Sequence, residues 1–397
     1  MIQRSACLRS LIQSFRAPPS SLSQLGAYNC YTAQANSSLQ KPSIYSDDEY
    51  ADVDWDNLGF GINPADYMYT MKCSKDENFE QGQLSRYRNI ELSPSAGVLN
   101  YGQARDDGLY ESTKAYKTKD GRVLLFRPDQ HAMRLKMGAE RLCMSSPSVD
   151  QFVNAVKEIA HANKRWVPPP GKGSLYMRPL LMGSGPVLGL APAPEYTFLI
   201  FASPVGNYFK AGFYFHCTLQ GTAPLNLYIE EEFVRATPGG AGGVKTIGNY
   251  APVLKAIARA KSRGFTDVLY LDSVNRKYLE EVSSCNIFIV KGDVISTPAT
   301  NGTILEGVTR KSIMDIARDH GYQVEERAIP VDELVDADEV FCTGTAVVVG
   351  PVGSITYQNR RIEYKMGPGS VSGKLYSTLV GIQTGLIEDK KGWTIEI

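Results

Sequence analysis

The sequence predicts a mixed α/β (α+β) protein with two domains. Its 397 residues are more than a single packed domain usually contains. From about residue 45, segments with helix-capping signals alternate with short β-prone runs. A loop-like stretch then separates an earlier group of elements from a later one. We therefore expect a small N-terminal α/β domain at 45–208, an interdomain linker at 209–224 and a large C-terminal domain at 225–397.

The N-terminal domain is expected to contain one clearly marked helix. Ser148 and Gln151 have the spacing of a capping box, in which each side chain accepts from a backbone amide of the other. Apolar residues at helical spacing continue to Ile159, and the prolines at 168–170 end the pattern. Two β-prone runs follow and predict strands at Leu175–Met182 and Tyr196–Pro204.

The C-terminal domain is expected to combine strands with helices. A glycine, Gly264 or Gly321, directly follows each predicted helix, where the left-handed conformation of a helix end suits it. The predicted helices are Pro252–Arg263 and Val308–His320, and the predicted strands are Leu225–Phe233, Val268–Leu271, Cys285–Val290 and Glu339–Phe341.

Composition excludes several classes of function. Basic and acidic residues both number 42, so no excess charge favours nucleic acid or an anionic membrane, and neither partner is expected. No apolar run reaches the roughly 18 residues that a membrane span needs. Seven cysteines contain no CxxC pair and four histidines have no metal-binding spacing. We therefore expect reduced thiols and no metal.

The first 44 residues differ in composition from the rest. They contain Arg4, Arg9 and Arg16 and many serines, and the first acidic residue is Asp47. Basic, acid-free, serine-rich and amphipathic segments are typical of organelle transit peptides. We interpret 1–44 as such a peptide. The early arginines favour a mitochondrion over a plastid, and a disordered cytosolic tail is the alternative interpretation.

Two lysines stand in glycine-rich surroundings. Gly373-Lys374 resembles a phosphate-binding loop, but Pro368 and Leu375 replace residues that such a loop requires. Lys245 lies in Gly243-Val-Lys-Thr-Ile-Gly248, where small neighbours would let a planar cofactor approach the backbone. A lysine acts as a nucleophile when its amine can lose its proton. Taken alone, this pattern also fits a solvated loop lysine.

Two further patterns point to anion binding. Thr303–Arg310 opens a predicted helix, and the free amides of a helix start can bind phosphate. Tyr176 and Arg178 are two residues apart on a predicted strand, so both side chains point to the same face. An ordinary capped helix and a buried ion pair are the alternative interpretations.

Together these segments resemble the branched-chain aminotransferases, which are fold-type-IV pyridoxal-phosphate enzymes. The resemblance covers about residues 52–397 and is strongest with plant members. It rests on five ordered motifs: Tyr176-Met-Arg-Pro179, Lys245-Thr-Ile-Gly-Asn-Tyr250, Glu281-Val282 followed by Asn286, Gly307-Val-Thr-Arg310 and Gly344-Thr-Ala346.

The resemblance implies a cofactor site for pyridoxal 5'-phosphate. Lys245 would hold the cofactor through a Schiff base and would move the proton at the reacting carbon. Glu281 would keep the pyridine nitrogen protonated, and Tyr250 would bind the ring hydroxyl. The residues implied for the phosphate are Arg134, Val308, Thr309 and Thr345.

The resemblance also implies how substrates are bound. Tyr176 and the amides of Thr345 and Ala346 would bind the α-carboxylate of leucine, isoleucine, valine or glutamate. Arg178, with Tyr101 of the partner subunit, would bind the side-chain carboxylate of glutamate or 2-oxoglutarate. The implied apolar wall consists of Phe60, Tyr110 and Tyr208. The enzyme would be a homodimer that transaminates by a ping-pong mechanism.

This sequence departs from the family in three places. No CxxC follows Ala346, residues 104–107 look inserted with Ser112 in place of a glycine, and the linker carries the extra apolar run 213–220. A catalytically impaired homologue, in which the inserts block the site, is therefore one alternative. A lyase of the same fold, similar to aminodeoxychorismate lyase, is the other, since it would keep Lys245 and Glu281.

Overall fold

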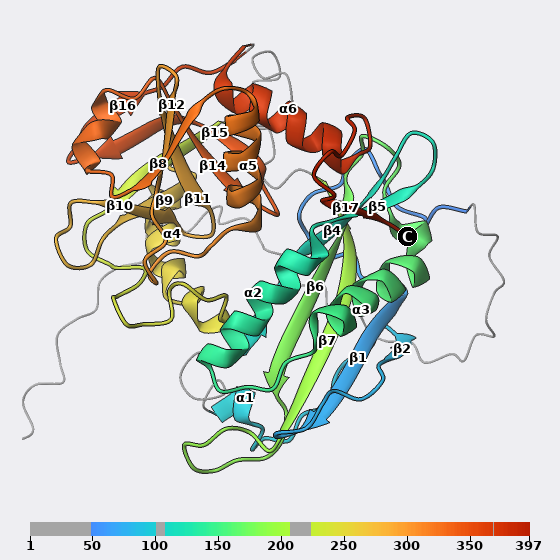
Figure 1. Cartoon of the computed structure of the whole chain (residues 1–397). Coiled ribbons are helices and arrows are strands. Elements are labelled where there is room, and N and C mark those ends of the chain that lie inside the picture. Colours follow the sequence, from blue (N-terminus) through green and yellow to red (C-terminus); the bar gives the residue numbers. More distant parts are fainter. Residues whose placement is uncertain (1–48, 101–107, 207–223, 368) are drawn as a thin grey trace, which may run out of the picture. The chain divides into compact units, whose positions relative to one another are not determined.

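The computed structural model describes residues 49–100, 108–206, 224–367 and 369–397. Residues 47–397 belong to one compact unit. Within the described residues, this unit contains an eight-stranded and a nine-stranded sheet (Figure 1). None of the helices in these ranges has both the length and the apolar character that crossing a membrane requires.

The first sheet is antiparallel throughout its described strands and combines early strands with one from the end of the chain. In spatial order it consists of β17 (Thr394–Glu396), β5 (Val123–Phe126), β4 (Thr113–Lys117), β6 (Ser174–Gly183), β7 (Glu195–Val205), β1 (Tyr67–Ser74) and β2 (Gln83–Arg86), while β3 (Leu109–Tyr110) pairs with β6. The long central strands β6 and β7 pair over their whole length, from Ser174 opposite Val205 to Gly183 opposite Tyr196.

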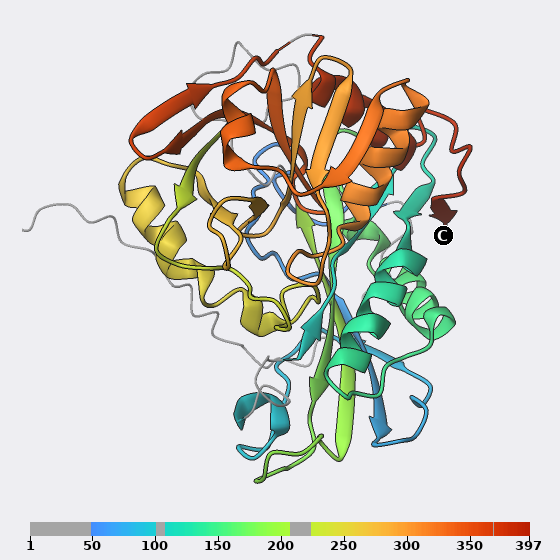
Figure 2. The ribbon, with the colours of Figure 1, turned by 60° about the vertical axis from the view of Figure 1, so that its left-hand side comes forward.

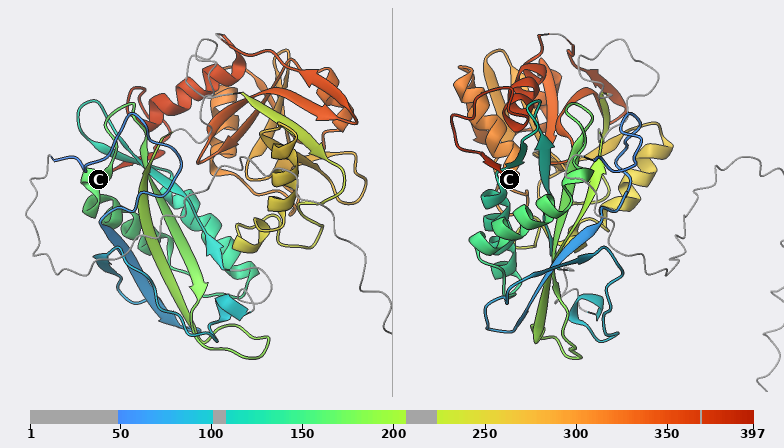
Figure 3. Two further views of the ribbon diagram at one scale, coloured as in Figure 1. Left: turned by 180° about the vertical axis from the view of Figure 1, so that it is seen from behind. Right: turned by 90° about the vertical axis from the view of Figure 1, so that its right-hand side faces the viewer.

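Two helices cover one face of this sheet, as the front and back views show (Figures 1 and 3). They are α2 (Pro128–Arg141) and α3 (Val149–Ala162), and a short α1 (Gly97–Asn100) lies elsewhere near β6. The apolar face of α3 includes Phe152, Val156 and Ile159, all fully buried against the sheet. Burial of side chains of this size stabilises the fold by roughly 1.5–3 kcal/mol each. Side chains on the opposite face of β4 and β6 are therefore not covered by these two helices and can line a site.

The second sheet mixes parallel and antiparallel pairs (Figure 2). In spatial order it consists of β10 (Leu279–Val282), β9 (Asp267–Leu271), β8 (Leu225–Glu230), β15 (Val348–Tyr357), β14 (Glu339–Gly344), β11 (Asn286–Lys291), β12 (Val294–Pro298) and β13 (Gln323–Arg327), while β16 (Arg360–Glu363) pairs with β15.

Three longer helices pack on the strands of the second sheet. They are α4 (Val253–Ser262), α5 (Val308–Asp319) and α6 (Val371–Gln383), accompanied by short 3₁₀ helices at Lys164–Trp166, Ile247–Asn249 and Val331–Val335. Phe288 of β11 stacks on Phe341 of β14, with ring centroids 4.9 Å apart, and both belong to the core beneath α5 and α6. The second sheet is thus tied to α5, whose first turn enters the site described below.

Most elements predicted from the sequence are confirmed. The helix after Ser148 forms with both capping-box hydrogen bonds, and β6 and β7 match the two predicted strands within one residue. Gly264 and Gly321 have φ values of +86°. Two strand ends were wrong. β8 ends at Glu230 rather than at Phe233, because the Glu230 carboxylate accepts from the backbone amides of residues 232 and 233 and closes a turn. β14 continues to Gly344 rather than ending at Phe341, because it pairs with β15 as far as Val348.

The division into domains at 45–208 and 225–397 stays a prediction, and most of the predicted linker lies outside the described residues. The final strand, β17, pairs with β5, so the end of the chain contributes to the first sheet.

Candidate active site

One cavity, of about 140 Å³, brings together side chains from both sheets. Its wall includes most of the residues that the sequence singled out: Phe60, Tyr110, Arg134, Tyr176, Arg178, Lys245, Glu281, Val308, Thr309 and the Thr345–Ala346 pair. Tyr250 lies directly behind this wall, in contact with Lys245. Tyr101 and Tyr208 lie outside the described residues, as do the segments 104–107 and 213–220.

Lys245 is held between two tyrosine rings. Its Nζ donates to the Tyr250 hydroxyl at 3.2 Å and lies 4.3 Å from the centroid of the Tyr110 ring. The two rings meet edge to face with centroids 5.0 Å apart. The backbone also helps to place this lysine, because the Tyr110 amide donates to the Lys245 carbonyl at 3.2 Å. The amine is therefore directed by β3 of the first sheet and by the residue that follows the 3₁₀ helix Ile247–Asn249.

The two tyrosines differ in acidity. Burial and the neighbouring Tyr250 raise the pKa of Tyr110, so its hydroxyl stays protonated. Burial opposes ionisation of Tyr250 as well, but the charges of Lys245 and Arg235 hold the pKa of Tyr250 below its ordinary value. Tyr250 is thus the hydroxyl of the pair that can share its proton with a neighbouring anion or amine.

Glu281 forms a buried ion pair that the sequence did not reveal. Its Oε1 lies 2.8 Å from Nη1 of Arg235 and accepts from the Leu305 amide at 3.0 Å. Burial raises the pKa of Glu281 to about 6 even though Arg235 opposes this shift. A further positive group next to this carboxylate would favour its ionised form.

The start of α5 forms another part of the wall. Val308 and Thr309 belong to the first turn, whose amides have no partner within the helix. Gly307 is the N-cap, and a Cβ on it would lie 2.1 Å from Oδ1 of Asn286. Asn286 in turn donates to the Leu305 carbonyl at 2.9 Å. Glycine is required here because the chain passes so close to Asn286.

Arg134 reaches the cavity from α2 as part of a buried polar cluster. Its Nε and Nη2 donate to the two carboxylate oxygens of Glu111 at 2.7 and 2.9 Å, and Nη1 donates to the Glu306 carbonyl at 3.1 Å. His131 Nδ1 lies 2.8 Å from the same carboxylate. Although burial opposes ionisation of Glu111, Arg134 and His131 hold the pKa of Glu111 well below its usual range. One N–H of the guanidinium, on Nη1, is not used by these contacts and can bind an anion.

Tyr176 and Arg178 share one face of β6, as predicted. Arg178 Nη2 donates to the Tyr176 hydroxyl at 2.9 Å, and the guanidinium lies 4.6 Å from the Tyr110 ring centroid. Within the described part of the chain, Arg178 forms no salt bridge with a carboxylate, and its Nε has no hydrogen-bond acceptor. A cavity-lining guanidinium in this state suits an external carboxylate.

The turn between β14 and β15 contributes Thr345, Ala346 and Val347 to the wall. Val348, which follows, has a φ of +63°. A β-branched residue rarely adopts this left-handed conformation, which costs on the order of 1–3 kcal/mol. Lys114 Nζ donates to the Ala346 carbonyl at 3.1 Å and so contacts the turn.

Sequence reasoning missed Arg235, the Glu111–His131 cluster and Lys114. Each is a buried polar residue whose partner is distant in the sequence, so short motifs do not include it. No local signal marks them, because Lys114, His131 and Arg235 each lie near other polar or charged residues in the sequence.

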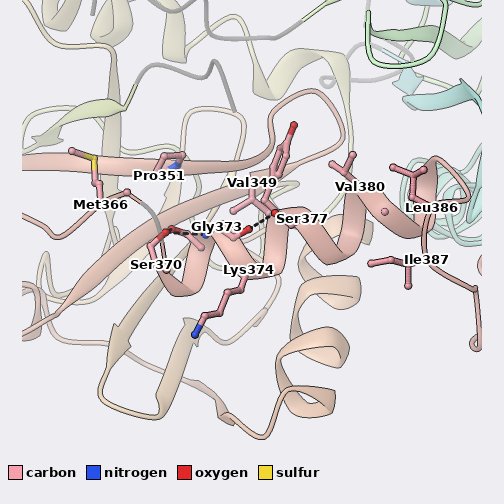
Figure 4. A pocket seen from close by; sticks show the side chains of 15 residues that line it. Val349, Pro351, Met366, Ser370, Gly373, Lys374, Ser377, Val380, Leu386 and Ile387 are labelled. Atoms are coloured by element: carbon pink, nitrogen blue, oxygen red, sulfur yellow. Dashed lines mark hydrogen bonds between the residues drawn. The ribbon is translucent and has the colours of Figure 1, made fainter. Parts of the chain in front are cut away.

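A larger groove, of about 570 Å³, lies beside α6 and β15 (Figure 4). It includes Gly373 and Lys374 of the phosphate-loop look-alike. The amides of Val371 and Ser372 at the start of α6 already donate to the Glu339 carboxylate at 2.8 and 3.1 Å. In Figure 4, Lys374 extends away from Val349 and Pro351 of β15. The first amides of α6 are therefore already occupied by a carboxylate, and the groove does not have the features of a phosphate site.

Comparison with known proteins agrees with this arrangement. Residues 108–355 match the family model of class IV amino-transferases. The chain is 69% identical to branched-chain-amino-acid aminotransferase 2, chloroplastic, of Arabidopsis thaliana, over 95% of this chain and 94% of that protein. It is 62% identical to branched-chain amino acid aminotransferase 1, mitochondrial, of Humulus lupulus, over the full length of both.

A solved structure, that of the T.th. branched-chain amino acid aminotransferase with pyridoxamine 5'-phosphate, is 27% identical and has a TM-score of 0.69. The match covers 84% of this chain and 99% of that one. The α/β class and the fold-type-IV expectation are thus confirmed. This chain belongs to the class IV aminotransferase family.

Proposed function

We propose that this chain is a pyridoxal-phosphate-dependent branched-chain aminotransferase. It exchanges the amino group between leucine, isoleucine or valine and 2-oxoglutarate, in two half-reactions that share one site. The observation that carries the proposal is the gathering of Lys245, buried Glu281, the start of α5 and Arg178 around one cavity. The high identity to branched-chain aminotransferases over nearly the whole chain supports the same conclusion.

The residues around the cavity fit pyridoxal 5'-phosphate. Lys245 would hold its aldehyde carbon, Glu281 its ring nitrogen and Tyr250 its ring hydroxyl. The raised pKa of Glu281 suits a carboxylate that faces the protonated ring nitrogen. The lowered pKa of Tyr250 suits a hydroxyl that shares its proton with the ring hydroxyl. The groups proposed for the phosphate are Arg134, the amides of Val308 and Thr309, and the hydroxyls of Thr309 and Thr345. The buried Thr343 hydroxyl has no partner among the described residues, so a polar ligand would also satisfy it.

When bound, pyridoxal phosphate supplies an electron sink that stabilises negative charge at the substrate Cα. The protein contributes the proton transfer. The Lys245 amine would take the proton from Cα of the substrate and deliver a proton to C4′ of the cofactor, which is general acid–base catalysis. The Tyr110 ring and the Tyr250 hydroxyl keep the amine in place while it does so.

Substrate recognition separates into a common part and a variable part. Tyr176 and the Thr345 and Ala346 amides bind the α-carboxylate, which every substrate has. Arg178 binds the second carboxylate of glutamate or 2-oxoglutarate, with Tyr101 of the partner subunit. The apolar wall proposed for the branched side chain consists of Phe60, Tyr110 and Tyr208. The high identity to branched-chain aminotransferases over nearly the whole chain supports transamination over lyase chemistry.

We further propose a homodimer and an organelle location. Leu188 and Leu190, between β6 and β7, are 88% and 75% exposed, and large apolar residues this exposed suit a subunit interface. Residues 1–44 act as a mitochondrial transit peptide, with the plastid as the alternative, since relatives carry either name. Fusion of 1–44 to a fluorescent reporter tests the location, and plastid or cytosolic signal alone contradicts it.

Borohydride reduction tests the assignment of Lys245. The purified protein is reduced and digested, and the pyridoxyl-labelled peptide is identified by mass spectrometry. We expect the label on Lys245 alone, and none on Lys245→Ala. The variant Lys255→Ala, which removes an exposed lysine of α4, should be labelled as the natural protein is. A label on a different lysine contradicts the proposed site.

A further inference from the structure

We propose that Lys114 is a positioning residue for substrate binding: it holds the Thr345–Ala346–Val347 turn in place and supplies the positive charge that attracts the α-carboxylate of every substrate. The inference deepens the proposed function and rests on it. It gives a role to a buried lysine that neither the cofactor nor the proton transfer uses.

The position of Lys114 follows from the register of the first sheet. Lys114 on β4 lies directly opposite Tyr176 on β6. Opposite residues of an antiparallel pair point to the same face, so Lys114 shares the cavity face with Tyr176 and Arg178. Its neighbour Ala115 points the other way, into the core under α2 and α3. Lys114 therefore lies beside the residues proposed to bind carboxylates.

The surroundings of Lys114 lack the anion that a buried lysine normally has. The side chain is 5% exposed, and its Nζ donates to the Ala346 carbonyl. Within the described ranges, no salt bridge joins it to a carboxylate. Buried charges are ordinarily paired, because an isolated charge is costly away from water. Consistent with this, burial alone lowers the pKa of Lys114 to about 7. A substrate carboxylate at the turn would provide the missing negative charge.

The turn that Lys114 contacts needs external support. Val348 holds a left-handed conformation at the start of β15, immediately after the turn. Strained backbone persists when neighbouring groups fix it. The bond from Lys114 to the Ala346 carbonyl fixes the orientation of that peptide group, and Thr345 and Ala346 line the cavity. Loss of the bond frees the turn to rotate away from a carboxylate-binding arrangement.

This role differs from that of Arg178 in a measurable way. Arg178 is proposed to bind a group that only glutamate and 2-oxoglutarate carry. Lys114 acts on the α-carboxylate, so its removal should weaken the binding of leucine, of glutamate and of their oxo acids alike. It should not change the proton transfer once substrate is bound, because Lys245 performs that step.

The test compares Lys114→Met, which keeps the length without the charge, with Lys114→Gln, a neutral side chain that can still donate. The full-length enzyme loaded with pyridoxal phosphate is titrated with 4-methylvaleric acid, the leucine skeleton without its amino group. Steady-state kinetics then give kcat and KM for leucine and for 2-oxoglutarate. The control is Lys119→Met, which removes an exposed lysine just beyond β4.

We expect Lys114→Met to raise the Kd of the acid and both KM values at least tenfold, with kcat changed less than threefold and the affinity for pyridoxal phosphate unchanged. Lys114→Gln should show a smaller rise and Lys119→Met none. Kd and KM values within twofold of the natural enzyme overturn the proposal. Loss of folding or of cofactor in both variants overturns it too, since the role would then be structural. Failure of the natural enzyme to convert leucine would refute the proposed function instead, and the acid titration, which needs no turnover, would still report on Lys114.

Discussion

The Glu281 carboxylate and the Arg235 guanidinium lie 2.8 Å apart, and the two residues are only 2% and 7% exposed. They come from different segments, since Arg235 follows β8 and Glu281 belongs to β10. The pair therefore couples the wall of the cofactor site to the packing of the second sheet.

Removing Arg235 should lower the free energy of unfolding more than removing an arginine from an exposed ion pair. Arg235→Met leaves a buried carboxylate without its cation, which typically costs about 3–5 kcal/mol of unfolding free energy. Chemical denaturation of the cofactor-free protein measures this loss. The control is Arg361→Met, whose partner Glu363 is 73% exposed and whose loss should cost less than about 1 kcal/mol. Equal losses of unfolding free energy in the two variants would show that the buried pair contributes no more to stability than the exposed pair does.

Glu281 should make the stability of the cofactor-free protein depend on pH. Its pKa rises from 4.5 to about 6 on folding, mainly because of burial. The folded state therefore holds the proton more tightly, so this contribution is present below pH 4.5 and is lost as pH rises through 6. The expected loss is about 2 kcal/mol. Unfolding measured from about pH 4 to 7 should show this decline relative to Glu281→Gln, and parallel curves for the two proteins would exclude it.

Arg178→Met should separate the two kinds of amino donor. Loss of a charge-assisted bond to the side-chain carboxylate costs roughly 1.5–3 kcal/mol, or about 10- to 150-fold in kcat/KM for glutamate. Leucine has no second carboxylate and serves as the internal control, with a change of less than about threefold. If both donors lose activity equally, Arg178 supports the structure rather than specificity.

Gly307→Ala should disturb the first turn of α5. The added Cβ would overlap Oδ1 of Asn286, and relief of such overpacking typically costs about 1–3 kcal/mol. We expect the affinity for pyridoxal phosphate, measured by fluorescence titration, to fall about tenfold or more. Gly61→Ala is the control, because a Cβ there meets no atom within 4 Å. Unchanged cofactor affinity in Gly307→Ala would mean that this turn does not bind the phosphate.

The parts of the site that the sequence predicted are those with a local signal. Lys245 and Tyr250 are five residues apart in one motif, and their contact needs only a short 3₁₀ turn between them. Tyr176 and Arg178 share a face because a strand alternates its side chains. The predicted helix of α3 and the strands β6 and β7 likewise depend on capping and apolar patterns that lie within one segment.

The parts that the sequence did not predict depend on buried polar residues or on distant pairing. The inward face of α2 carries His131 and Arg134, which hides its helical periodicity. Strand β10 buries Glu280 and Glu281, so it lacks the apolar alternation of a strand. The pairing of β17 with β5 joins segments separated by most of the chain, and no local pattern indicates it.

The half-reaction with leucine alone tests the central claim most directly. Purified enzyme saturated with pyridoxal phosphate is mixed with leucine in the absence of an oxo acid, and the products and cofactor spectrum are recorded. We predict release of one equivalent of 4-methyl-2-oxopentanoate per Lys245 site, conversion of the cofactor to pyridoxamine phosphate, and further release only after 2-oxoglutarate is added. No oxo acid product, or continued turnover without an acceptor, would contradict the assignment as a branched-chain aminotransferase.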